Sequence, residues 1–399
     1  MANFLYKAKD LNGQEHKGEI EAGDVRLAAL ILRKRGLVVT DVTVKKKSVY
    51  LLDKFLNKVG FSELVTITRQ LATMISAGLV LSEAIDILEE QQENKGLKQV
   101  LAEVSHDIKG GLSLAEAMSR HTEVFPILYV NLVKSGEASG KLDEVFLRMA
   151  DSLEKEREFR ARVKGAIIYP IVVITMMMAV IIIMMIFVIP KLTSLYRDST
   201  LDLPLPTKIL IATSDLFVNF WWLMIIILGI TVAVLKRWVK TPAGGLAFDR
   251  LLLKTPIIGK VITNVTLTNF SRTFGLLVSA GIPLLEAINI VGGVTENQVF
   301  RNALKSSYAG VERGMPFSSL LSLSIFPKIV SQMVKVGEET GKVDEIFFKL
   351  SEYFESESDH LVKNLTVAIE PIILIVLGIG VGFLVLSIIL PIYKLTTSF

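Results

Sequence analysis

Three long apolar runs interrupt an otherwise mixed pattern of apolar and polar residues along the chain. Residues 166–189 contain no charged side chain, residues 216–235 end before Lys236, and residues 368–390 carry a single acidic residue, Glu370. A helix of about 20 apolar residues crosses a hydrocarbon core about 30 Å thick. Because lipid offers no hydrogen-bond partner to a bare peptide group, each run is predicted to be a transmembrane helix.

A fourth apolar segment, residues 275–293, is predicted to stay outside the membrane. It contains Glu286 and Asn289, together with Pro283 and several glycines. A charge near the centre of a span costs about 3 kcal/mol or more. The segment is therefore interpreted as a buried helical hairpin within a bundle.

Basic residues flank the apolar runs unequally, and this asymmetry predicts how the chain crosses the membrane. Five precede the first run and three follow the second: Lys155, Arg157, Arg160, Arg162 and Lys164, then Lys236, Arg237 and Lys240. Segments rich in Lys and Arg stay on the cytoplasmic side. Residues 1–165 and 236 to about 368 are thus predicted to be cytoplasmic. The 190–215 loop and the tail at 391–399 are predicted to be extracytoplasmic.

The chain also contains an internal repeat. RQLATMISAGLVLSEAI begins at Arg69 and its counterpart RTFGLLVSAGIPLLEAI at Arg272, while FPILYVNLVKSGEASGKLDEVF begins at Phe125 and FPKIVSQMVKVGEETGKVDEIF at Phe326. Within each copy apolar residues recur at helical spacing, and the breaks fall at glycines and prolines. Each copy is predicted to be an antiparallel bundle of about six short helices, at 60–165 and 260–367.

The first 48 residues follow a different pattern. Two short segments flank Asp10–Gly13, a hairpin-turn signal, and residues 24–35 form a helical stretch before the strand-like LVVTDVTV. Residues 1–48 are therefore predicted to form a small ββαβ domain. The basic run Lys45–Lys47 is interpreted as a linker.

Composition excludes several kinds of site. The 399 residues have a high mean hydropathy of +0.50, contain no cysteine, and scatter four histidines without metal-ligand spacing. The net charge of +4 does not indicate a nucleic-acid partner. We find no catalytic constellation, so neither enzymatic activity nor a cofactor nor a metal is expected.

A glycine-bordered joint occurs once in each copy. The residues are Gly136, Glu137, Gly140, Lys141 and Asp143 in the first copy, and Gly337, Glu338, Gly341, Lys342 and Asp344 in the second. A phosphate-binding loop has four residues between its glycines and a Ser or Thr after the Lys. Here three residues separate the glycines, and Leu142 or Val343 follows the Lys. Nucleotide binding is therefore not predicted.

Two interpretations of the joints stay open. In the first they are helix–turn–helix connections, in which Ser139 or Thr340 caps the following helix and the acids of its first turn favour the helix dipole. In the second they form a docking surface for a partner.

A second group of candidates concerns packing within the membrane: Tyr169, Pro170, Glu370, Pro371, Gly378 and Gly382. Glu370 is expected either to lie in headgroup water at a helix start or to form a buried hydrogen bond or charge pair in a helix bundle. The spacing of Gly378 and Gly382 allows two helices to approach closely, although lipid-facing glycines are also tolerated.

The whole chain resembles the F-type inner-membrane platform proteins of type IV pilus and type II secretion systems. The resemblance rests on YKAKDLNGQEHKGEIEA at the N-terminus, both Arg-to-Ile stretches, both joints, Tyr169–Pro170, Glu370–Pro371 and LPLPT at 203–207. It implies a bacterial inner-membrane scaffold, usually a homo-oligomer, whose cytoplasmic bundles engage a hexameric ATPase. Its membrane part would deliver pilin or pseudopilin subunits into a filament, together with other inner-membrane assembly proteins and lipid.

The motifs do not separate pilus assembly from type II secretion. A transporter is a more distant alternative, since duplicated halves are common among transporters. However, the chain has three predicted spans and few polar residues within them. A membrane enzyme is disfavoured by the missing catalytic constellations.

Overall fold

The computed structural model describes residues 2–9, 15–22, 25–34, 38–44, 58–191 and 205–397. Contacts divide the chain into two compact units, one containing residues 1–60 and 89–102, the other residues 61–88 and 103–399. Helix dominates the described residues, as predicted.

The N-terminal residues form the predicted ββαβ domain. Its elements are β1 (Ala2–Lys9), β2 (Glu15–Ala22), α1 (Val25–Lys34) and β3 (Val38–Val44). The sheet has the order β2-β1-β3, and both pairings are antiparallel. The predicted turn at Asp10–Gly13 and the basic run Lys45–Lys47 lie outside the described residues.

Two homologous six-helix bundles follow, which confirms the prediction from the internal repeat. The first contains α3 (Phe61–Ser76), α4 (Leu81–Gln91), α5 (Lys95–Lys109), α6 (Leu114–Ser119), α7 (Ile127–Ser139) and the start of α8 (Leu142–Ile183). The second contains α12 (Ile258–Ser279), α13 (Leu284–Val294), α14 (Gln298–Glu312), α15 (Phe317–Ser322), α16 (Lys328–Thr340) and the start of α17 (Val343–Thr397). The apolar segment 275–293 is the hairpin between α12 and α13, whose 11-residue second arm is too short to cross a membrane.

Aromatic rings fill the core of the second bundle. Phe347 of α17 is fully buried, with its ring 4.3 Å from that of Phe274 and 5.5 Å from that of Phe270, both on α12. The Phe317 ring of α15 stacks on Phe274 at 5.4 Å and lies 6.5 Å from Phe347. These contacts join three helices into one body, because each buried ring removes a large apolar surface from water.

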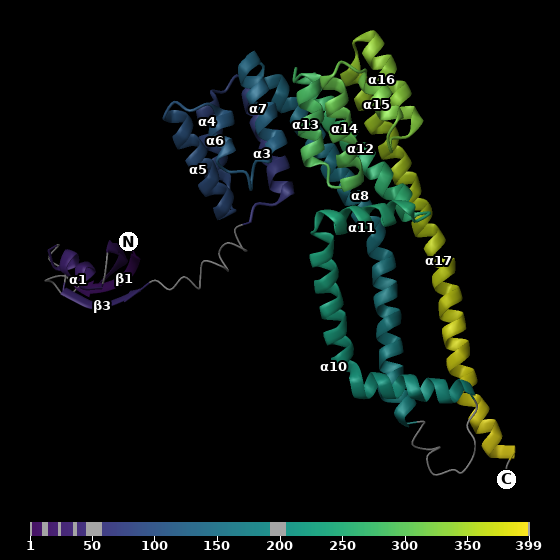
Figure 1. Ribbon diagram of the computed structural model, residues 1–399. Helices are drawn as coiled ribbons and strands as arrows, with labels where there is room; N and C mark the ends of the chain where they lie inside the picture. The colour runs from purple at the N-terminus through teal and green to yellow at the C-terminus, as the bar shows by residue number, and fades with distance from the viewer. Residues whose placement is uncertain are drawn as a thin grey trace. The chain divides into compact units, whose positions relative to one another are not determined.

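Each bundle continues into an apolar helix without a break. α8 runs from the first joint to Ile183, passes through a π-helical turn, η1 (Met184–Val188), and ends at Lys191. α17 runs from the second joint to Thr397 (Figure 1). Residues 391–397, predicted as a tail after the third span, therefore continue that helix. The helix continues through Pro391, where one backbone hydrogen bond is lost because proline has no N–H.

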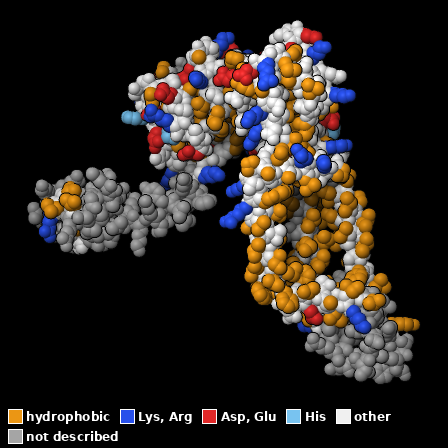
Figure 2. Space-filling model, in the orientation of Figure 1, with side chains coloured by type: hydrophobic (Ala, Val, Ile, Leu, Met, Phe, Trp, Pro, Cys, Tyr) orange, Lys and Arg blue, Asp and Glu red, His pale blue; other side chains and the backbone are white. Residues whose placement is uncertain are grey.

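Three helices in the described residues are long and apolar enough to cross a membrane: Leu142–Lys191, Thr207–Val239 and Val343–Ser387. In the most apolar stretch of each helix, 0 to 6 % of the residues are buried by other parts of the chain. Figure 2 shows apolar side chains covering the visible face of these helices, whereas acidic and basic side chains gather over the bundles.

The connection at 190–215 was predicted as a loop, but α10 (Leu205–Val239) already begins at Leu205. A kink at Phe220 divides α10 into two arms (Figure 1). The first arm packs on the ends of the other two spans, since Thr207 donates a 2.8 Å hydrogen bond to the Ser387 carbonyl and Ser214 a 2.6 Å bond to the Met185 carbonyl. These long-range contacts stabilise the first arm of α10. This helix was not predicted, because its sequence contains polar residues and prolines.

A further helix, α11 (Pro242–Lys254), connects the second span to the second bundle and was not predicted. Thr241 caps its start by accepting a hydrogen bond from the Gly244 N–H at 3.1 Å. The Asp249 carboxylate then accepts a 2.7 Å hydrogen bond from the Gln298 N–H, the first residue of α14. α11 is therefore fixed to the second bundle through a helix start.

Candidate functional site

The joint of the first bundle has a defined structural role. Gly140 ends α7 in the left-handed conformation, at φ +67°, and the Lys141 N–H donates to the Gly136 carbonyl at 2.9 Å. The Glu137 carboxylate accepts hydrogen bonds from the N–H groups of Leu114 at 2.6 Å and Ala115 at 3.0 Å. Glu137 thus caps α6, a helix more than 20 residues earlier in the sequence.

The second joint repeats this arrangement. Gly341 ends α16 at φ +70°. The Glu338 carboxylate accepts from the N–H of Phe317 at 2.8 Å and of Ser318 at 3.3 Å, and from the Ser318 hydroxyl at 2.5 Å. The motif therefore holds the start of α15 against the end of α16.

The first glycine of each joint permits close helix packing. A Cβ on Gly136 would lie 3.1 Å from Leu142 and 3.2 Å from Val145, and a Cβ on Gly337 would lie 3.2 Å from Ile346. These distances are shorter than ordinary van der Waals contacts, so an alanine would force the neighbouring side chains to move. The joint glycines are thus explained by packing and turn geometry.

The predicted capping by Ser139 and Thr340 is wrong. Ser139 donates to the Ser135 carbonyl at 2.8 Å, and Thr340 donates to the Val336 carbonyl at 2.7 Å. Both hydroxyls lie in the last turn of the preceding helix, where the carbonyl four residues earlier is within reach. They therefore bond back into α7 and α16.

Of the other joint residues, Lys141, Asp143 and Lys342 are exposed and Asp344 is partly exposed. Lys141 and Lys342 are exposed and pair with the neighbouring Glu144 and Glu345 at 3.6 and 3.1 Å. Asp143 and Asp344 lie in the first turns of α8 and α17. Exposed pairs of this kind contribute about 0–1 kcal/mol, so these side chains can contact a partner at little cost to the fold.

Glu338→Ala should destabilise the second bundle, because two backbone N–H groups at the start of α15 lose a charged acceptor. The expected loss is about 1–3 kcal/mol. Thermal unfolding of the full-length protein in detergent measures it. Glu339→Ala is the matched control, since Glu339 is exposed and makes a 3.8 Å pair with Lys335. Equal losses in the two variants would contradict the capping role.

A charged fork holds the first helix of the first bundle against its long helix. Arg69 of α3 donates from Nε to Glu154 Oε1 at 2.8 Å and from Nη2 to Glu154 Oε2 at 2.5 Å. Nη2 also bonds Asp151 at 2.5 Å. These hydrogen bonds raise the pKa of Arg69, and they hold the pKa of Glu154 below its usual range. Arg69 and Glu154 are therefore both charged at neutral pH.

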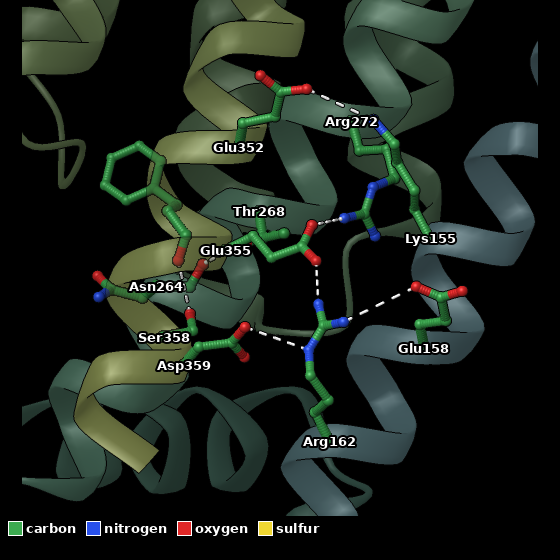
Figure 3. Close-up of polar contacts among 11 residues, drawn as sticks. Lys155, Glu158, Arg162, Asn264, Thr268, Arg272, Glu352, Glu355, Ser358 and Asp359 are labelled. Atoms are coloured by element: carbon green, nitrogen blue, oxygen red, sulfur yellow. Dashed lines mark hydrogen bonds and ion pairs between the residues drawn. The ribbon is translucent and has the colours of Figure 1, made fainter. Parts of the chain in front are cut away.

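The second bundle carries the equivalent arginine, Arg272 of α12, but its acid is shared between the bundles (Figure 3). Glu355 of α17 accepts from Arg272 through Oε2 and from Arg162 of α8 through Oε1. Arg162 also pairs with Asp359 at 3.1 Å and with Glu158 of its own helix at 3.8 Å. We call Arg162, Arg272, Glu355 and Asp359 the inter-bundle cluster.

Burial makes the inter-bundle cluster sensitive to its partners. The side chain of Arg272 is 5 % exposed and that of Glu355 17 %, whereas that of Arg162 is 44 % exposed. Burial is the largest effect on Arg272 and lowers the pKa of its guanidinium, while the nearby Glu355 opposes that shift. Removing Glu355 would therefore leave a buried, poorly compensated cation.

The bundles also meet away from this cluster. Ser135 donates to the Ala280 carbonyl at 2.6 Å, and Arg148 donates to the Ser279 carbonyl at 3.2 Å, both at the end of α12. Lys155 pairs with Glu352 at 3.4 Å. A mainly apolar cleft of about 300 Å³ lies between the bundles, with Arg272 in its wall.

The candidates within the membrane differ in exposure where their side chains are described. Pro170 is buried, Tyr169 is 51 % exposed, and Pro371 is exposed. A Cβ on Gly378 or Gly382 would meet no atom within 4 Å. The side chain of Glu370 lies outside those that the structure describes.

Sequence reasoning missed the inter-bundle cluster. The repeat did align Arg69 with Arg272, which signalled a shared role, but the helix contacts that bring Arg162 to Glu355 cannot be read from spacing. No group of three or more His, Asp or Glu residues suited to a metal was found in the described part of the chain.

Comparison with known proteins gives the family. The family model for type II secretion system protein F matches residues 67–190 and 270–391. The family model for the N-terminal domain of protein F matches residues 1–43. The type IV pilus assembly protein PilC of Thermus thermophilus is 37 % identical over 99 % of this chain and 98 % of its own length.

Two further relatives match over similar lengths. PilC of Myxococcus xanthus is 33 % identical over 99 % of this chain and 95 % of its own. The type II secretion system protein F of Xanthomonas campestris is 31 % identical over the full length of both chains. With both repeats and the N-terminal domain matched, the chain belongs to the protein F family of type II secretion and type IV pilus assembly systems.

Proposed function

We propose that this protein is the inner-membrane platform of a type IV pilus system, coupling a cytoplasmic ATPase to the insertion of pilin subunits into a filament. The observation that carries the proposal is full-length similarity to proteins named for type IV pilus assembly, at 33 to 37 % identity. Four relatives named for type II secretion are 29 to 31 % identical. The equivalent platform of a secretion system is the alternative.

The long helices support a mechanical role. α8 has 42 residues and α17 has 55, so at 1.5 Å per residue they extend about 60 and 80 Å. Each is part of a bundle at one end and of an apolar span at the other. Displacement of a bundle would therefore reach the membrane without an intervening flexible linker.

We infer that both bundles face the cytoplasm and that the C-terminus faces the other side of the inner membrane. The Lys and Arg residues before the first span and after the second support this orientation. The exposed joint residues Lys141, Asp143 and Lys342, with the partly exposed Asp344, are then accessible to a hexameric ATPase. The exposed apolar faces of the spans are accessible to lipid, to pilin helices, to other assembly proteins and to further copies of the chain.

Deleting the gene in its host should abolish surface filaments, and a plasmid copy should restore them. Electron microscopy counts the filaments. The control is a strain that carries the plasmid without the gene. Normal filaments in the deleted strain would overturn the proposal, and loss of protein secretion with filaments intact would favour the secretion system instead.

Charge reversal tests whether the joints bind the ATPase. Lys141→Glu combined with Lys342→Glu should reduce the amount of ATPase that co-purifies with the protein, because both side chains are exposed and add little to stability. Lys305→Glu, at an exposed position on α14, is the matched control. If the same amount of ATPase co-purified with the unchanged protein, the double variant and the control, the joints would be excluded as the docking surface.

A further inference from the structure

The two bundles use equivalent acids in different ways. In the first bundle, Asp151 and Glu154 both accept hydrogen bonds from Arg69, and Glu154 does so through both of its oxygens. In the second, the equivalent acids are Glu352 and Glu355. Each of them reaches out to a basic residue of the first bundle, Glu352 to Lys155 and Glu355 to Arg162. Arg272 is left with a single hydrogen-bond acceptor, Glu355 Oε2, among the described residues.

This sharing leaves a buried donor unsatisfied. Arg272 Nη1 has no hydrogen-bond partner within the described part of the chain, although the residue is buried. Figure 3 shows the guanidinium of Arg272 bonded to Glu355 through one nitrogen, with the second oxygen of that carboxylate turned to Arg162. A buried unpaired donor is unfavourable, so a bidentate fork between Arg272 and Glu355 is a competing arrangement.

Both sides of the contact have a second partner. If Arg162 withdraws, it keeps Glu158 on its own helix, 3.8 Å away. Glu355 can then form with Arg272 the fork that Glu154 forms with Arg69. In the open arrangement Asp359 loses Arg162, but its side chain is 39 % exposed and can be solvated by water. The shared and the forked arrangement thus each pair the buried Arg272 with Glu355, and two such discrete arrangements make a bistable element.

We propose that Glu355 is a positioning residue that exchanges between Arg162 and Arg272, and that this exchange sets the separation of the two long helices. When Glu355 is shared, α8 and α17 are clasped just before their apolar spans begin. When Glu355 turns wholly to Arg272, the clasp opens and the two spans can separate. The inference goes beyond the proposed function, because it concerns the coupling of the two bundles in any system that uses this chain.

Double electron–electron resonance, which measures the distance between two spin labels, tests the exchange in the full-length protein. The chain has no cysteine, so Ala161→Cys on α8 and Asn364→Cys on α17 introduce the labelling sites. Both positions are exposed and lie outside the inter-bundle cluster. The protein is reconstituted in lipid nanodiscs. We expect a short and a long distance, corresponding to the clasped and open arrangements.

Two variants should act in opposite directions. Arg162→Gln removes the ion pair between Arg162 and Glu355. The ratio of the short-distance population to the long-distance population should therefore fall about fivefold or more. Arg272→Lys keeps the charge but cannot form the bidentate fork, so the same ratio should rise. Arg69→Lys is the matched control, because it weakens the fork of the first bundle and should leave the ratio unchanged.

A merely structural role for Arg272 would give a different result. Arg272→Lys would then loosen the bundle and lengthen the distance, as Arg162→Gln does. That outcome would overturn the exchange, as would an unchanged distribution in Arg162→Gln. If Arg272→Lys unfolds, Arg162→Lys takes its place, and it should restore part of the short population that Arg162→Gln loses. No restoration would count against the clasp.

Discussion

Phe347→Ala should destabilise the second bundle by about 3–5 kcal/mol, the usual range for removing a buried aromatic ring. The Phe347 side chain is fully buried and contacts the rings of Phe270, Phe274 and Phe317. These rings belong to α12 and α15, so the cavity would open where three helices meet. Chemical denaturation of the full-length protein in detergent, followed by limited proteolysis, measures the loss and locates it.

Tyr353→Ala is the control for this variant. Tyr353 lies on the same helix, but it is 45 % exposed, and among the described residues its ring contacts only that of Phe354. Its loss should cost less than about 1 kcal/mol, since exposed side chains have small effects. If both variants were equally stable, the aromatic rings would not be the core that unites the second bundle.

Gly259→Ala should have the second large effect, by disrupting the connection between the second span and its bundle. A Cβ at this position would lie 2.3 Å from the Leu253 carbonyl oxygen and 3.0 Å from that of Leu252. Because both atoms belong to the backbone of α11, no side-chain rotation relieves the clash. Overpacking of this kind costs about 1–3 kcal/mol or more. Thermal unfolding measures the loss, and proteolysis near residue 255 should become faster.

Gly293→Ala is the control for the glycine variant. A Cβ there would meet no atom within 4 Å, and the residue lies in α13. Alanine favours a helix over glycine by about 1 kcal/mol, so the control should be neutral or slightly stabilising. A similar loss in both variants would mean that the close packing of α11 on α12 has no special importance.

Hydropathy and the internal repeat were sufficient to predict the main features of the fold. The spans follow from composition, because lipid imposes a strict requirement on length and polarity. The bundles follow from duplicated helical spacing. The first arm of α10 and the whole of α11 were missed, because Thr207, Ser214 and Asp249 stabilise those helices through partners distant in the sequence.

The candidate site was predicted in part. The motif predicted a turn between the two glycines of each joint. Gly140 forms that turn in the left-handed conformation, whereas Gly136 and Glu137 still belong to the last turns of α7. The partner of Glu137 could not be predicted, since α6 reaches it only through tertiary packing. The inter-bundle cluster was invisible for the same reason: whether Glu355 serves its own bundle or the other depends on how α8 and α17 pack.

Accessibility of single cysteines tests the central claim, that both bundles lie on the cytoplasmic side of one membrane. Lys134→Cys on α7 and Lys335→Cys on α16 are equivalent exposed positions, and Lys208→Cys lies on the first arm of α10. A membrane-impermeant maleimide should label position 208 in intact spheroplasts and positions 134 and 335 in inverted vesicles. Labelling of either bundle in intact spheroplasts would contradict the account.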